Sequence, residues 1–238
     1  MSRLLKVYLR NIFKQKGYYV CTGISLLIGV IIPFVISLFI KSTDTITLAS
    51  RIVDSFKVDI IIVIYITLFV CSDFTDGTAK NFIARGYSRR QILYGKYLAS
   101  LIAVGVYFLG CLAFTLAFFA KDGLNFTISD LYMILAAIVT AVASTGLYVI
   151  VANTAEKVST GIAVNIIMFS FFGLLLEGLT TLLKLNINLS NYWITGLTGL
   201  MGEKAVLVDL FKVIGIAAVY LVLLFEISNF IIKKKEVK

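Results

Sequence analysis

The stretch LYGKYLASLIAVGVYFLGCLAFTLAFFA, residues 93–120, decides the fold class of this protein. It is predominantly apolar along its whole length, and Lys96 is its single charged residue. A helix of about 20 apolar residues crosses a hydrocarbon core of ~30 Å, so this stretch is long enough to span a membrane. A membrane β-barrel would show short alternating segments instead, and the continuous apolar run therefore predicts a transmembrane helix.

The composition extends this prediction to the whole chain. Of the 238 residues, 60% are hydrophobic and 15% are charged, whereas soluble domains are nearer half apolar and a quarter charged. A soluble core of this size cannot hide so much apolar surface, so the excess must face lipid. We expect an all-α membrane protein whose single domain is a six-helix bundle over 18–232. Its spans are predicted at about 18–40, 58–73, 93–120, 129–152, 158–183 and 206–232.

The basic residues predict the orientation of this bundle. Six spans return the chain to its starting side, so segments 1–17, 74–92, 153–157 and the basic tail 233–238 share one side. With Lys96, these segments hold most of the 22 Lys and Arg residues, which marks their side as cytoplasmic. The net charge of +9 is thereby explained by topology, and nucleic-acid binding is not expected. The predicted location is a bacterial cytoplasmic membrane, crossed several times.

The first 17 residues form a feature of their own. Basic residues recur at spacings of three, four and four, and apolar residues cover the rest of the turn. This pattern predicts an amphipathic "elbow" helix in the plane of an anionic cytoplasmic leaflet, retained rather than cleaved as a signal peptide. We expect Gly17 to end the helix. The basic stripe consists of Arg3, Lys6, Arg10 and Lys14.

The most informative loop is SDFTDGTAKNFIARGYSRRQILYGKYLAS, residues 72–100. Asp76-Gly77 is turn chemistry, Thr78 is a predicted N-cap for a short helix, and Gly86 is its predicted C-terminal stop. Ser88 and Gln91 form an S-x-x-Q capping box that opens the third span. The loop over 74–92 therefore predicts a short capped helix on the cytoplasmic face.

Side chains of this short helix are suited to a soluble partner. Apolar Phe82 and Ile83 are predicted to protrude as knobs, and four cations surround them. Docking to another protein is the favoured interpretation, and the alternative is that these charges only anchor the topology. The four cations are Lys80, Arg85, Arg89 and Arg90.

The segment DFTDGTAKNFIARGYSRRQILYGK, residues 73–96, resembles the cytoplasmic loop of ABC-2-type permeases. In that family the loop is a coupling helix that sits in a groove of the ATPase subunit. The family also has six spans, an elbow helix and re-entrant outer helices before the last span. The resemblance implies coupling roles for Gly77, Thr78, Lys80, Asn81, Gly86, Ser88, Arg89 and Lys96. Small permeases of this kind are similar to those of Gram-positive clusters for antimicrobial-peptide export or immunity.

Nothing in the sequence indicates catalysis on this chain. It contains no histidine, which excludes histidine-based triads and HExxH zinc sites. Three isolated cysteines have no metal-site spacing, and no G-x-x-x-x-G-K-[ST] phosphate loop is present. We therefore expect a non-catalytic subunit without a cofactor or metal of its own, with ATP and Mg²⁺ on a partner ATPase.

Four further features of the sequence add to this prediction, and three of them have two interpretations. Glu226 is a carboxylate inside the last predicted span, and is either functional or a snorkelling structural acid. Asn153 and Asn165 are predicted packing contacts between helices. Pro33 predicts a kink in the first span, as a hinge or only as shape. Residues 184–205 are either an outer re-entrant element or an ordinary loop.

The resulting prediction is the transmembrane subunit of an ABC-2-type exporter for an amphipathic peptide or a lipid-like molecule. The resemblance implies a second permease copy or a sister permease, two ATPase subunits and membrane lipid as partners. One alternative is an ATP-independent secondary transporter or channel, which would carry several buried charges at the membrane midplane. Another is a membrane immunity or regulatory protein that transports nothing.

Overall fold

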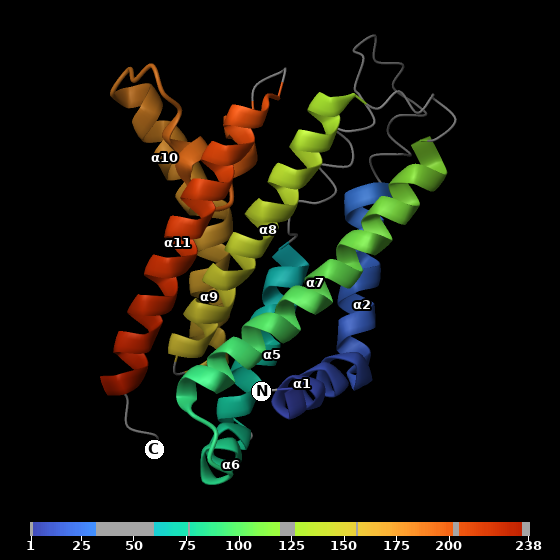
Figure 1. Cartoon of the computed structure of the whole chain (residues 1–238), viewed down its shortest axis with the longest axis vertical. Coiled ribbons are helices and arrows are strands. Elements are labelled where there is room, and N and C mark those ends of the chain that lie inside the picture. Colours follow the sequence, from blue (N-terminus) through green and yellow to red (C-terminus); the bar gives the residue numbers. More distant parts are fainter. Residues whose placement is uncertain are drawn as a thin grey trace.

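The regular elements of the computed structural model are helices (Figure 1). The structure describes residues 2–31, 60–75, 77–119, 127–155, 157–201 and 205–234. Two π-helical turns continue helices, at Leu27–Ile31 and Ile167–Phe171. The α-helices are α1 Ser2–Lys14, α2 Lys16–Leu26, α5 Ile60–Thr75, α6 Thr78–Ala84, α7 Arg89–Phe119, α8 Ile128–Thr154, α9 Val158–Ile166, α10 Phe172–Leu182 and α11 Leu207–Lys234.

Four helices within the described residues are long and apolar enough to cross a membrane. They run over Arg89–Ala117, Ile128–Thr154, Val158–Leu182 and Leu207–Ile231. A fifth span results only if α5 and α6, which are bent by 53° to each other, are counted as one broken span. The third to sixth expected spans are thereby confirmed, and the chain is a multi-pass membrane protein.

The first two expected spans are not among these four. Helix α5 has 16 residues, which at 1.5 Å each reach about 24 Å, short of a ~30 Å hydrocarbon core. Of the expected span at 18–40, only the part up to Ile31 lies within the described residues. Pro33 and its predicted kink lie outside them. The described chain therefore supports four or five spans rather than the expected six.

Helix α8 lies at the centre of the bundle. Of its apolar window, 67% is buried, against 6% for the Val158–Leu182 window and 17% for the Leu207–Ile231 window. Small residues such as Ala137, Ala141 and Ser144 line it and let neighbours approach closely. A Cβ on Gly146 would lie 2.6 Å from a methyl carbon of Leu221 on α11. The apolar faces of α9–α11 point outward, as expected in lipid.

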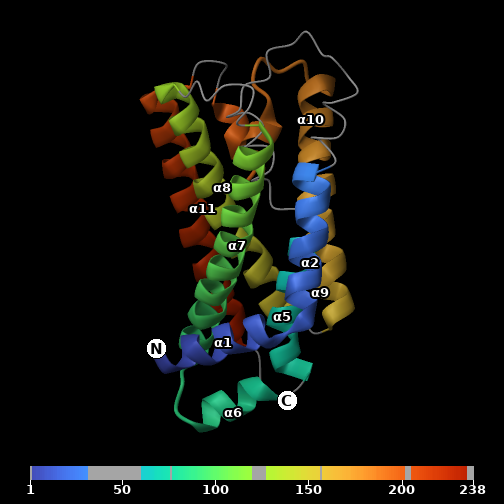
Figure 2. The ribbon, with the colours of Figure 1, turned by 90° about the vertical axis from the view of Figure 1, so that its right-hand side faces the viewer.

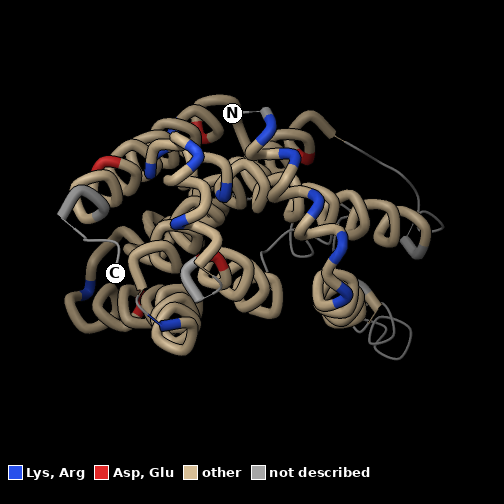
Figure 3. Tube along the Cα trace, turned by 90° about the horizontal axis from the view of Figure 1, so that it is seen from below, with Lys and Arg blue, Asp and Glu red and all other residues tan. Residues whose placement is uncertain are grey.

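One end of the bundle is covered by two short helices. Helix α1 lies across it, and α6 lies beyond α1, farther from the bundle centre (Figure 2). The N-terminal helix and the end of α11 lie at this same end (Figure 1). Viewed from below, Lys and Arg predominate over Asp and Glu (Figure 3).

The segment after α10 folds back along the bundle. Two 3-10 turns, at Leu189–Tyr192 and Leu197–Leu200, bring Ile194 and Leu197 into the core. The Trp193 indole donates to the Met168 carbonyl oxygen at 3.2 Å, in the middle of the Val158–Leu182 helix. This path favours the re-entrant interpretation of 184–205 over an ordinary outer loop.

The end of the elbow helix differs from the prediction. Helix α1 ends at Lys14, and extended Gln15 separates it from α2. Gly17 lies in the first turn of α2 and does not end a helix. The break between the helices is at Gln15, two residues before the predicted position. The turn is closed instead by backbone hydrogen bonds from Gln15 to Ile12 and from Tyr18 to Gln15.

Candidate functional site

The predicted short cytoplasmic helix is present as α6, Thr78–Ala84. Two glycines in left-handed backbone conformations flank it, with φ of 67° at Gly77 and 88° at Gly86. Most L side chains strongly disfavour this region, so glycine is required for both sharp breaks. Gly86 is thus confirmed as the stop. The N-cap is Gly77 rather than Thr78, which is the first helical residue.

The predicted capping box at the start of α7 is confirmed. The Gln91 backbone N–H donates to Ser88 Oγ at 3.2 Å, and the Ser88 backbone N–H donates to Gln91 Oε1 at 3.0 Å. The two bonds satisfy backbone donors that the first turn of a helix leaves without partners. Helix α7 therefore begins at Arg89, and the loop between α6 and α7 has a defined geometry.

The side chains around α6 divide into an outer and an inner set. Lys80, Asn81 and Arg85 are exposed on the helix, while Phe82 is 5% exposed and packs inward. The predicted protruding knob at Phe82 is therefore wrong, because its ring belongs to the core. Of the other predicted coupling residues, Gly77, Thr78, Ile83 and Arg89 are half-buried, and Gly86, Ser88 and Arg90 are exposed.

The inward-facing ring of Phe82 packs on the elbow helix. Its centroid lies 5.5 Å from that of Tyr8 on α1, whose ring also meets Phe69 of α5 edge-on at 5.9 Å. Gly95 of α7 lies against the same ring, since a Cβ there would be 3.2 Å from Tyr8 Cε2. Tyr8 is fully buried and joins α1, α5, α6 and α7.

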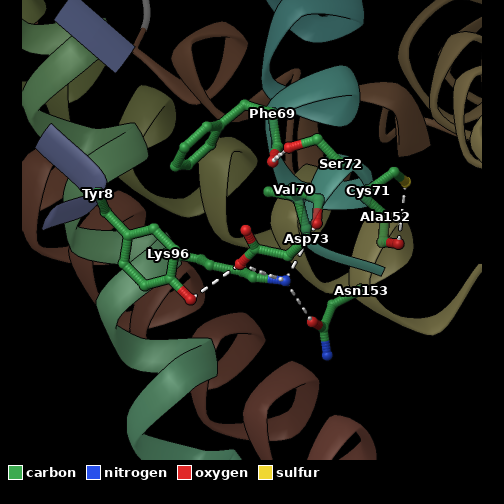
Figure 4. A network of polar contacts seen from close by, with 9 residues as sticks. All are labelled: Tyr8, Phe69, Val70, Cys71, Ser72, Asp73, Lys96, Ala152 and Asn153. Carbon is green, nitrogen blue, oxygen red and sulfur yellow. Dashed lines mark hydrogen bonds and ion pairs between the residues drawn. The ribbon is translucent and has the colours of Figure 1, made fainter. Parts of the chain in front are cut away.

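The hydroxyl of Tyr8 belongs to a buried polar cluster, shown in Figure 4. It donates to Asp73 Oδ2 at 2.8 Å, and the same carboxylate oxygen lies 3.4 Å from Lys96 Nζ. Lys96 also donates to the Val70 carbonyl oxygen at 3.0 Å and to Asn153 Oδ1 at 3.5 Å. Residues from α1, α5, α7 and α8 thereby meet around one ion pair.

The cluster is closed to solvent. Lys96 is 0% exposed and Asp73 is 5% exposed. Buried charges are costly unless they are paired and hydrogen-bonded, which both are here. Burial, together with the neighbouring Asp73 carboxylate, raises the pKa of the Tyr8 hydroxyl far above its ordinary value, so Tyr8 remains a neutral donor. The arrangement suits a structural joint rather than a catalytic centre.

Sequence reasoning missed this cluster. It counted Lys96 among the cytoplasmic cations and gave Asp73 no role, whereas Lys96 is buried and Asp73 lies buried at the end of α5. The sequence feature that could have indicated this cluster is Lys96 itself, because it is the single charge within the apolar stretch 93–120. Its partners lie 23 and 57 residues away in the chain, and no local pattern relates them.

The elbow helix carries its predicted basic stripe. Arg3, Lys6, Arg10 and Lys14 are exposed. The opposite side of α1 presents a buried line of Leu4, Tyr8 and Ile12. The prediction placed the apolar side of α1 in lipid, but much of it packs against protein.

The remaining candidate residues lie apart from this cluster. Glu226 is exposed on α11, next to Phe225, whose ring stacks on that of Tyr94 at 5.0 Å. Asn165 is a helix contact as predicted, since its Nδ2 donates to Thr67 Oγ1 at 2.7 Å. Among the described residues, no three His, Cys, Asp or Glu side chains gather in a way that would hold a metal.

Comparison with known proteins gives one match. Residues 45–238 match the model of a family described as "Protein of unknown function (DUF2705)". No curated protein and no solved structure matches the chain. The match includes α5–α11 and so covers Asp73, Lys96 and Asn153, while α1 with Tyr8 precedes it. The matched part is well over half of the chain, which therefore belongs to the DUF2705 family.

Proposed function

We propose that this chain is the transmembrane subunit of an ATP-driven exporter of the ABC-2 type. The observation that carries the proposal is α6, a short helix between two left-handed glycines at the end of a membrane bundle. Its outer side offers Lys80, Asn81 and Arg85. A short, rigid, basic element presented in this way suits a groove on a soluble ATPase.

The bundle offers a route for mechanical coupling. Phe82 ties α6 to Tyr8, and the Tyr8–Asp73–Lys96 cluster ties that contact to the α5, α7 and α8 helices. Closure of an ATPase dimer on ATP would displace α6 and α1 together, and the attached helices would follow. A second copy of this chain or a sister permease would supply the other half of the pathway, with ATP and Mg²⁺ bound to the ATPase.

An amphipathic peptide or a lipid-like molecule is the substrate class that fits best. The buried charges of the described bundle are occupied, Asp73 and Lys96 with each other and Asp130 in the capping box with Thr127 at the start of α8, so they do not suit a small ion. The outward faces of α9–α11 are apolar, and a groove of about 440 Å³ between Tyr192 and α11 is lined by side chains such as Ile216, Val219 and Leu223. Export and self-protection against an antimicrobial peptide both use such a route.

Co-purification with a P-loop ATPase encoded beside the gene tests the proposal. Arg85→Glu reverses a charge on the exposed side of α6 and should abolish the complex. Lys157→Glu is the matched control, because Lys157 is an exposed cation between α8 and α9, outside the segment assigned to docking. Equal retention of the ATPase by both variants, or no complex with the unmodified chain, would count against the proposal.

The buried ion pair favours a second candidate, an ATP-independent transporter. Ionisable groups inside a membrane protein often carry protons or ions. Asp73 lies in the last turn of α5, near one end of the bundle rather than at its middle, which suits a structural role better. Substrate uptake by liposomes that contain the chain alone, driven by a proton or sodium gradient, would favour this candidate. A non-transporting immunity protein would bind its peptide and show no flux with either energy source.

A further inference from the structure

Helix α1 presents two opposite faces with different chemistry. At 3.6 residues per turn, Leu4, Tyr8 and Ile12 fall on one side, and all three are at most 1% exposed. The exposed cations Arg3, Lys6, Arg10 and Lys14 fall on the other side. They are named here the α1 stripe. Within α1 no acidic residue interrupts it.

The two basic elements of this end lie at different levels. Helix α6 lies farther from the bundle centre than α1 in both views (Figures 1 and 2). Helix α1 runs across the helices of the bundle rather than along them, and α2 rises from it after the break at Gln15 (Figure 2). A crosswise amphipathic helix beside the ends of the spans has the placement expected at headgroup depth, whereas α6 lies farther out.

We propose that the α1 stripe binds the phosphate groups of anionic phospholipids, and that Tyr8 transmits this binding to the position of α6. The stripe extends along about three turns and meets a flat layer of headgroups, which a straight row of cations fits. Half-buried Leu5, Leu9 and Phe13 flank the buried line and continue the apolar side toward the acyl chains. Each Lys or Arg near an anionic leaflet contributes about fivefold to binding.

The transmission follows from contacts on the inner side of α1. The Tyr8 ring packs on Phe82 of α6 at 5.5 Å between centroids, and its hydroxyl bonds to Asp73 of α5 at 2.8 Å. Leu4 and Tyr8 both abut Gly95 of α7. A helix held in this way cannot shift on a lipid surface without moving Phe82. Lipid composition would thereby change the position of α6, the helix that the proposed function assigns to ATPase docking.

Lipid preference of the full-length protein tests the first half of this inference. Native mass spectrometry would count dioleoylphosphatidylglycerol against dioleoylphosphatidylcholine retained from mixed micelles. We expect at least a fivefold preference for the anionic lipid, lost when Arg3, Lys6, Arg10 and Lys14 are all changed to Gln. The matched control changes Lys80, Arg85 and Arg90 to Gln and should keep the preference. Retention of the preference by the α1 variant, or its loss in the control, would overturn the proposal.

The second half is tested by trypsin cleavage after Arg85 in nanodiscs of either lipid. Phosphatidylglycerol should slow this cleavage several-fold in the unmodified chain, but not in the α1 variant or in Tyr8→Leu, which loses both ring and hydroxyl. Tyr8→Phe keeps the ring and should keep most of the effect. The assay needs neither ATP nor ATPase, so it stands apart from the proposed transport activity. If the α1 variant binds lipid normally but loses an acidic protein partner, the stripe is a protein surface and the inference is wrong.

Discussion

Lys96 and Asp73 are the residues on which the end of the bundle covered by α1 and α6 depends most. Each is buried, and each keeps its charge compensated through the other, while Tyr8, Val70 and Asn153 fill the remaining hydrogen-bonding positions. In a medium of low dielectric constant an uncompensated charge is far more costly than a pair. The pair therefore ties α5 to α7 with a specificity that apolar side chains would not provide.

Loss of one member of the pair should destabilise the protein strongly. Lys96→Met leaves the Asp73 carboxylate buried without a cation and is expected to lower the free energy of unfolding by about 3–5 kcal/mol. Adding Asp73→Asn to Lys96→Met should recover a large part of this loss, because both charges are then absent. Denaturant unfolding in detergent measures both variants. Strictly additive losses would show that the two residues do not interact.

Gly86 allows a second prediction at this scale. Its φ of 88° is a conformation that costs an L residue about 1–2 kcal/mol, so Gly86→Ala should loosen the end of α6. Gly105→Ala is the control, because Gly105 lies within α7 with nothing within 4 Å of an added Cβ. Hydrogen exchange of the α6 amides should accelerate about tenfold in the first variant and stay unchanged in the second. Equal exchange in both would contradict the role given to Gly86.

At the scale of elements, the contact between α1 and α7 is the one most sensitive to added side-chain volume. An added Cβ at Gly95 would lie 3.1 Å from Leu4 Cδ2 and 3.2 Å from Tyr8 Cε2. Gly95→Leu should therefore displace α1 from α7, and trypsin should cleave after Lys6 and Arg10 several-fold faster. Gly105→Leu adds the same volume at an open position of the same helix and should leave the cleavage rate unchanged. Slow cleavage in both variants would mean that α1 does not rest on Gly95.

The hydrogen bond between α5 and α9 is expected to contribute less to stability than the buried ion pair. Asn165 Nδ2 donates to Thr67 Oγ1 at 2.7 Å and to the Tyr148 carbonyl oxygen at 3.1 Å. Such bonds in membrane bundles contribute about 0.6 kcal/mol on average. A double-mutant cycle of Thr67→Val and Asn165→Leu should give a coupling energy of this size. A coupling energy of zero would show that Thr67 and Asn165 do not stabilise this contact through their hydrogen bond.

The sequence predicted features that depend on neighbouring residues better than those that depend on distant helices. The Ser88–Gln91 box and the Gly86 stop depend on neighbours in the chain, and both were predictable. The inward direction of Phe82 depends on α1, which is far away in sequence and fills the space beside it. The burial of Lys96 likewise depends on three other helices. Apolar length predicted six spans, of which four are confirmed, and it predicted the 16-residue length of α5 with a shift of two residues.

At the scale of the whole molecule, the structure is a bundle with a central α8, apolar outer helices and a basic end covered by α1 and α6. In the view from below, Lys and Arg predominate over Asp and Glu (Figure 3), as expected for the cytoplasmic side of a membrane protein. The polar cluster joins the covering helices to the spans. The proposed function uses this connection, because force applied to α6 would reach α5, α7 and α8 through Tyr8 and Asp73.

Photo-crosslinking from Ala84 tests the central claim most directly, since Ala84 is an exposed residue of α6. A photoreactive amino acid at position 84 of the full chain in its native membrane should form an adduct with a P-loop ATPase encoded beside the gene. The same amino acid at Glu177, an exposed position of α10 at the other end of the bundle, should form none. An ATPase adduct from position 177, or its absence from position 84, would contradict the account.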